Sequence, residues 1–117
     1  MVNIKFYTDY SQSKVLSKLL SYESADMYYS KHDTIYADTL YDSCDIQFFQ
    51  IRGYIPCWSL SALLEVLPKS INNEALSIKT SATLWYIGYQ NYYTVKADNV
   101  INGCYELIVY LHELKLL

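Results

Sequence analysis

The clearest hydrophobic pattern near the middle of the chain lies between Ser59 and Pro68. Apolar side chains recur there at spacings of three and four residues, the period of one helix face: Leu60, Leu63, Leu64 and Leu67. Ser59 is a suitable N-cap, because its hydroxyl can accept a hydrogen bond from the first helical turn. Pro68 ends the pattern, and Pro56 stiffens the approach to it. The pattern predicts a short helix with a buried leucine stripe, on which Trp58 packs through Leu63.

Two further helices are predicted, one on each side of this central helix. The first begins at Asp9 or Ser11 and runs to about Leu20, with apolar residues on one face and lysines on the other. The last begins at Asp98 as its N-cap. Its apolar positions again recur every three or four residues: Val100, Ile101, Cys104, Leu107, Ile108 and Leu111.

Strands are predicted where short apolar or alternating segments are bounded by turn residues. These segments span residues 27–29, 46–51, 75–80, 83–89 and 92–95. Turns at Asn72–Asn73 and Gln90–Asn91 make the last three an antiparallel meander, whereas residues 30–45 show no sustained period and suit a loop or edge hairpin. The sequence therefore predicts an α+β fold, with a small antiparallel sheet of three to five strands packed against about three helices. Its 117 residues suit a single domain, 1–117.

Tyrosine is unusually frequent, with 14 of 117 residues, against a usual share of roughly 3%. One interpretation is a small domain that completes the edge of its core with amphipathic rings. The other is a tyrosine-lined surface for a partner or ligand, because tyrosine is enriched at interfaces.

The net charge of −3 arises in one region. Between Glu23 and Asp45 there are six acidic residues against the single Lys31, and the remaining chain is nearly balanced. No basic footprint for nucleic acid is present, so we expect no direct nucleic-acid binding. The acidic, tyrosine-bearing region is the predicted interaction surface, with these residues as its candidates: Tyr28, Tyr29, Tyr36, Asp38, Tyr41 and Asp42.

Three widely spaced cysteines, Cys44, Cys57 and Cys104, indicate neither a disulfide framework nor a zinc site. We expect three free thiols. No apolar run reaches the ~18 residues of a membrane span, and the first residues show no signal-peptide pattern. A cytoplasmic protein without a membrane partner is the expectation.

Candidate catalytic groups are few. Ser24-Ala25-Asp26 offers a hydroxyl and a carboxylate, but no histidine lies nearby in sequence to act as a base, so we interpret it as a capped turn. His32 and His112 could meet a carboxylate such as Asp38 in a metal site, although no local ligand spacing supports one. We therefore predict no catalytic residue, no metal and no cofactor.

Three segments together resemble a family of small uncharacterised proteins from gut anaerobic bacteria and their phages or mobile elements. Gln12-Ser13-Lys14 with Ser24-Ala25-Asp26-Met27-Tyr28-Tyr29 is similar to the family's opening, where threonine usually replaces Ser24. The segment from Pro56 to Leu64 is similar to its P-x-WSL-x-x-LL centre. Cys104-Tyr105-Glu106 with Leu111-His112-Glu113 is similar to its last helix, although Asn102-Gly103 stands where Asp-Ala is common, and the glycine weakens the helix by roughly 1 kcal/mol. The resemblance implies a phage or mobile-element origin and no assigned activity.

The leading hypothesis is a non-catalytic protein-interaction module with a protein partner. The alternative is a protein that binds or sequesters a nucleotide-like small molecule between tyrosine rings, which stack well on bases. A homodimer is compatible with the sequence.

Overall fold

The computed structural model describes residues 5–29, 35–36, 53–90 and 93–117. The predicted strand 46–51 and most of the predicted loop 30–45 lie outside these residues. In chain order the elements are α1 (Tyr10–Leu16), η1 (Tyr22–Ser24), β1 (Met27–Tyr29), β2 (Ile35–Tyr36), β3 (Ile55–Cys57), α3 (Leu60–Val66), β4 (Ser70–Ile71), β5 (Glu74–Ala75), β6 (Ser77–Ser81), β7 (Leu84–Tyr89), β8 (Tyr93–Ala97) and α4 (Val100–Glu113).

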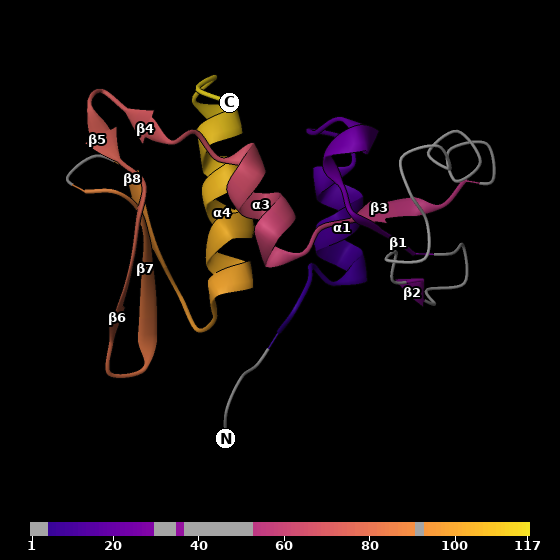
Figure 1. Cartoon of the computed structure of the whole chain (residues 1–117), viewed down its shortest axis with the longest axis horizontal. Helices are drawn as coiled ribbons and strands as arrows, with labels where there is room; N and C mark the ends of the chain where they lie inside the picture. The colour runs from indigo at the N-terminus through magenta and orange to yellow at the C-terminus, as the bar shows by residue number, and fades with distance from the viewer. Residues whose placement is uncertain (1–4, 30–34, 37–52, 91–92) are drawn as a thin grey trace.

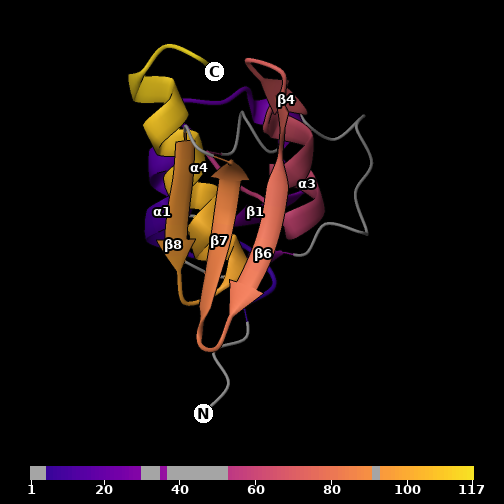
Figure 2. The same cartoon turned by 90° about the vertical axis from the view of Figure 1, so that its left-hand side faces the viewer.

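The helices lie between two small antiparallel sheets (Figure 1). One sheet has the strand order β6-β7-β8, and α4 covers one of its faces, as the view onto the sheet shows (Figure 2). The other has the order β2-β1-β3 and contacts α1 through β3. A separate β4-β5 hairpin completes the sheets. The predicted α+β class is confirmed.

The core forms where α3 and α4 meet each other and the β6-β7-β8 sheet. Its largest fully buried side chains include Trp58, Leu63, Tyr89 and Leu107. Helix α4 approaches the sheet closely at Gly103, where a Cβ atom would lie 2.2 Å from Cδ1 of Ile87. The predicted face of α4 is buried at Ile101, Cys104, Leu107, Ile108 and Leu111.

Helix α3 forms as its local sequence predicts. The Ala62 backbone N–H donates to the Ser59 hydroxyl oxygen at 3.2 Å, which confirms the N-cap. Leu63 and Leu67 are fully buried, whereas Leu60 and Leu64 are partly buried against the core. The helix ends at Val66, before Pro68.

The ends of two other helices differ from the prediction. Asp9 caps α1 as expected, but the helix ends at Leu16, because tighter bonds such as Leu19 N–H to the Leu16 carbonyl replace the helical ladder. The N-cap of α4 is Asn99, not Asp98. Asn99 has extended backbone angles and its side chain accepts from the Asn102 N–H at 2.8 Å.

The strand pattern also needs two corrections. The segment Ile55–Cys57, predicted only as a stiff approach to the central helix, is strand β3 and pairs with β1. Its Pro56 is tolerated because β3 lies at the edge of its sheet. The predicted strand 75–80 is divided between β5 and β6, and the three-stranded meander β6-β7-β8 is otherwise confirmed. Asn72–Asn73 form the predicted turn, both with positive φ.

Candidate functional site

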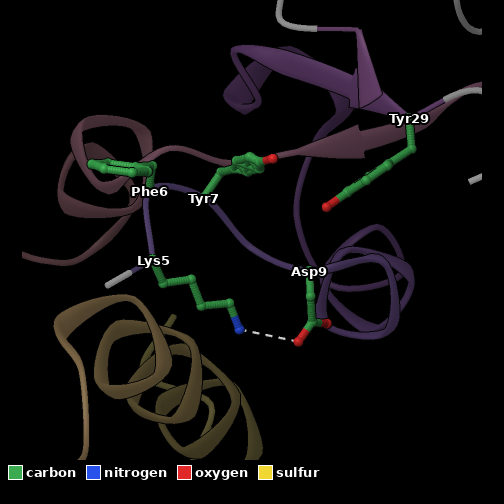
Figure 3. A pocket seen from close by; sticks show the side chains of 5 residues that line it. All are labelled: Lys5, Phe6, Tyr7, Asp9 and Tyr29. Atoms are coloured by element: carbon green, nitrogen blue, oxygen red, sulfur yellow. Dashed lines mark hydrogen bonds and ion pairs between the residues drawn. The ribbon is translucent and has the colours of Figure 1, made fainter. Parts of the chain in front are cut away.

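A pocket of about 280 Å³ opens beside the segment that leads into α1. Its lining comes from that segment and from β1: Lys5, Phe6, Tyr7, Asp9 and Tyr29. Figure 3 shows the aromatic side chains on one side of the hollow and the Lys5–Asp9 pair on the other. The pocket is therefore an aromatic site with one ion pair at its margin.

Thr8 fixes the pocket segment to the rest of the protein. Its N–H donates to the Trp58 carbonyl at 3.0 Å, and its hydroxyl accepts from the Trp58 N–H at 3.1 Å. The same hydroxyl shares a 2.8 Å hydrogen bond with the Ser13 hydroxyl. Thr8 and Ser13 are fully buried, so the pocket segment has a rigid base despite lying outside any helix or strand.

Tyr29 forms a fixed wall of the pocket. Its hydroxyl donates to the Thr8 carbonyl at 2.9 Å. Its ring makes edge-to-face contacts with Tyr7 and Tyr10, at centroid distances of 6.5 and 5.4 Å. Burial raises the pKa of the Tyr29 phenol well above its ordinary value, so the hydroxyl is protonated and remains a donor at neutral pH.

Phe6 is the most unusual residue of the site. Its side chain is 76% exposed, although phenylalanine is an apolar residue that is usually buried. It lies next to the partly buried Tyr7 at the margin of the hollow (Figure 3). Aromatic residues are enriched at protein interfaces, so an exposed aromatic ring beside an aromatic hollow suits a contact site for another molecule.

The Lys5 ammonium joins the pocket segment to two helices. It donates to the Asp9 carboxylate at 3.0 Å, to Gln12 Oε1 at 2.9 Å and to Asn102 Oδ1 at 2.8 Å. Gln12 and Asn102 are also bonded to each other at 2.8 Å. An ammonium has three N–H donors, so these three acceptors use all of them.

Asp9 holds the start of α1 and faces the pocket. Its carboxylate accepts from the Gln12 N–H at 2.8 Å, and the Gln12 side chain accepts from the Asp9 N–H, a complete capping box. Partial burial works to raise the pKa of Asp9, but the Gln12 N–H and the Lys5 ammonium outweigh it and lower that pKa. The carboxylate is therefore ionised at neutral pH.

The residues predicted as the interaction surface are only partly described. Tyr28 and Tyr29 are 5% and 7% exposed. Tyr28 stacks on Tyr22 at 5.5 Å, and Tyr29 is the predicted residue that lines the pocket. Tyr36 lies in β2. Asp38, Tyr41 and Asp42 lie outside the described residues, and their part of the surface stays a prediction.

The Ser24-Ala25-Asp26 segment connects to the start of α3. Ser24 Oγ accepts from the Trp58 indole N–H at 3.0 Å. The Asp26 carboxylate accepts from both the backbone N–H and the hydroxyl of Ser59. Ser59 is thus a hydroxyl next to a carboxylate, but its oxygen also caps α3, and these contacts support the interpretation as a capped turn.

Within the described part of the chain, no group of three or more His, Cys, Asp or Glu residues is placed to hold a metal ion. Cys57 and Cys104 are buried free thiols, while Cys44 lies outside the described residues. Burial raises the pKa of both thiols, that of Cys104 to about 12. Neither is a candidate nucleophile, because the thiolate is the reactive form.

Comparison of the chain with protein-family models, with curated proteins and with solved structures finds no match. The resemblance in sequence motifs therefore stays a prediction. None of the helices in the described residues has the length and apolar character needed to cross a bilayer.

Four of the pocket residues are not predicted from the sequence as a binding group: Lys5, Phe6, Tyr7 and Asp9. The tyrosine excess predicts a ring-lined surface, and Tyr29 of that predicted surface lies in the pocket lining. The available signal was Phe6 itself, an aromatic residue outside every periodic pattern of the chain.

Proposed function

We propose that the protein is a non-catalytic interaction module, acting in the cytoplasm, that binds a partner protein through the pocket beside α1. The partner inserts an apolar side chain between Phe6, Tyr7 and Tyr29. The single observation that carries this proposal is the 76% exposure of Phe6 at the margin of an aromatic hollow. The buried free thiols Cys57 and Cys104 support a reducing compartment.

The size of the pocket suits a side chain of a partner. Its volume of about 280 Å³ lies just below the range of roughly 300–1,000 Å³ found for small-molecule sites. One or two side chains of a partner fill such a hollow, and the exposed Phe6 ring extends the contact beyond it. Aromatic anchors in pockets of this kind carry most of the binding energy at protein interfaces.

The second candidate is a small molecule stacked between the tyrosine rings, and it is favoured by Tyr7 and Tyr29 in the lining. A nucleotide-like ligand fits less well, since it brings phosphate charge. Lys5 is the cation of the lining, and its three N–H groups are already donated within the protein. A phosphate placed here would have to displace one of these bonds.

The test is selection of peptides from a random display library on the wild-type protein. Binding of the selected peptides is then measured with Phe6→Ala and with Leu114→Ala. Leu114 is a matched control, because it is also an exposed apolar residue, with 43% exposure. It lies at the C-terminal end of α4, whereas Lys5 of the pocket contacts Asn102 near the start of that helix. Truncating an interface anchor costs about 2 kcal/mol or more, so we expect affinity to fall at least about tenfold in Phe6→Ala.

The Leu114→Ala variant should bind like the wild type. Selected peptides that bind Phe6→Ala and the wild type equally would contradict the proposal. Binding of adenosine monophosphate at the pocket, with no peptide selected, would favour the second candidate.

A further inference from the structure

The electrostatics of the pocket indicate which peptides it selects. We propose that the pocket prefers a segment in which a basic residue adjoins the apolar anchor, with the basic group facing Asp9. This inference rests on the proposed function and adds the charge of the partner to it. Its evidence is the unequal exposure of the Lys5–Asp9 pair and the state of their hydrogen bonds.

The two charges at the margin of the pocket are not equally available. The Asp9 side chain is 50% exposed, and the Lys5 side chain is 22% exposed. The Lys5 ammonium has no remaining N–H for an anion, because Asp9, Gln12 and Asn102 take all three. An acidic residue of a partner therefore gains no new bond from the cation in the lining.

The Asp9 carboxylate can accept more bonds. A carboxylate has about four acceptor positions on its two oxygens. One Asp9 oxygen accepts from the Gln12 N–H and the other from the Lys5 ammonium, and the Ser11 backbone N–H contributes a further bond. Its exposed half is open to a lysine or arginine of a partner. A guanidinium could also stack on an aromatic face of the lining, where the ring quadrupole attracts a cation.

The same pocket offers both aromatic rings and a carboxylate. Tyr7 and Tyr29 line this pocket together with Asp9, and the exposed Phe6 ring lies apart from them at its margin (Figure 3). The pocket thus combines an apolar anchor site with one accessible anion.

The experiment uses three synthetic peptides that differ only in charge: Ser-X-Trp-X-Ser with X as lysine, glutamine or glutamate, blocked at both ends. Their dissociation constants are measured from NMR shifts of the ring signals of Phe6, Tyr7 and Tyr29. The lysine peptide should bind about threefold to fivefold more tightly than the glutamine peptide, as for exposed ion pairs, and the glutamate peptide should bind most weakly. The difference should shrink in about 1 M salt.

Two variants separate a local carboxylate from net charge. Asp9→Asn keeps an N-cap side chain and removes the charge at the pocket, whereas Glu23→Gln removes one exposed charge in η1. We expect the lysine preference to disappear in Asp9→Asn and to remain in Glu23→Gln.

Equal binding of all three peptides at the pocket would overturn the charge inference and leave the proposed function in place. Tightest binding of the glutamate peptide, or loss of the preference in Glu23→Gln alone, would also overturn it. Binding by none of the three, together with no peptide from the library, would remove the proposed function and this inference together.

Discussion

Gly103 of α4 and Ile87 of β7 fix how closely the helix approaches the sheet, since a Cβ on Gly103 would lie 2.2 Å from Ile87 Cδ1. By helix propensity alone, Gly103→Ala should stabilise the helix by about 1 kcal/mol. Here overpacking costs about 1–3 kcal/mol, so we expect a net loss of up to about 2 kcal/mol in the free energy of unfolding, measured by urea denaturation.

Ile87→Val supplies the control, because it removes the Cδ1 atom in question. Gly103→Ala should be less destabilising in the Ile87→Val background, which a double-mutant cycle detects as a coupling energy. A Gly103→Ala protein more stable than the wild type would show that the close approach is not required.

The contact between Asp26 and Ser59 should matter for stability although both residues are far apart in sequence. Asp26→Ala removes the acceptor of the Ser59 N–H and hydroxyl. Both bonds are exposed and water can replace the carboxylate, so the unfolding free energy should fall by about 0.5–1.5 kcal/mol. Glu23→Ala, a neighbouring exposed acid, should change it by less than about 0.5 kcal/mol. Equal effects in the two variants would argue against the capping role of Asp26.

Stability should fall at high pH. Burial raises the pKa of the Cys104 thiol to about 12 from 9.0, and that of Tyr89 to about 12 from 10.0. Both groups ionise earlier in the unfolded chain, so their stabilisation is complete below about pH 9 and is lost as pH rises toward 12. The urea midpoints of unfolding at about pH 7.5 and about pH 10 measure this loss of stability. The midpoint of Cys104→Ala should fall less between the two pH values than that of the wild type. A wild-type midpoint that is unchanged between the two pH values would contradict the prediction.

Lys5→Met should weaken both the fold and peptide binding. The variant loses three bonds of a partly buried ammonium, while Gln12 and Asn102 keep their bond to each other. The pocket segment then loses its connection to α4. We expect a stability loss of about 0.5–1.5 kcal/mol and a severalfold weaker affinity for the selected peptides. Unchanged affinity would mean that the Lys5 contacts to the two helices do not support the pocket.

The local signals of the sequence predicted local structure well. Ser59 and Leu63 define α3 because a cap and a 3.6-residue period act within one helix. Asp98 and Asn99 are both good capping residues, so the pattern alone did not choose between them. Strand β3 was missed because its three residues, with a proline at the centre, pair with β1 across a long separation in sequence.

The site depends on tertiary structure and was harder to predict. Phe6 is exposed and Tyr29 is buried, yet both are aromatic residues beside another tyrosine. The hydrogen bond from the Tyr29 hydroxyl to the Thr8 carbonyl places the pocket segment against β1, and the Thr8 bonds to Trp58 and Ser13 hold it to the rest of the fold. The close approach at Gly103 of α4 likewise depends on Ile87 of strand β7, whereas helix propensity alone treats this glycine as a weakness.

The most direct test of the central claim is an NMR map of the protein with one selected peptide. We expect the ring and amide signals of Phe6, Tyr7 and Tyr29 to shift when the peptide is added. The amide signals of Asp38, Tyr41 and Asp42, the candidates in the acidic region, should shift less. This result would place the partner in the pocket. Shifts concentrated at Asp38, Tyr41 and Asp42, with Phe6 and Tyr7 unchanged, would contradict the claim.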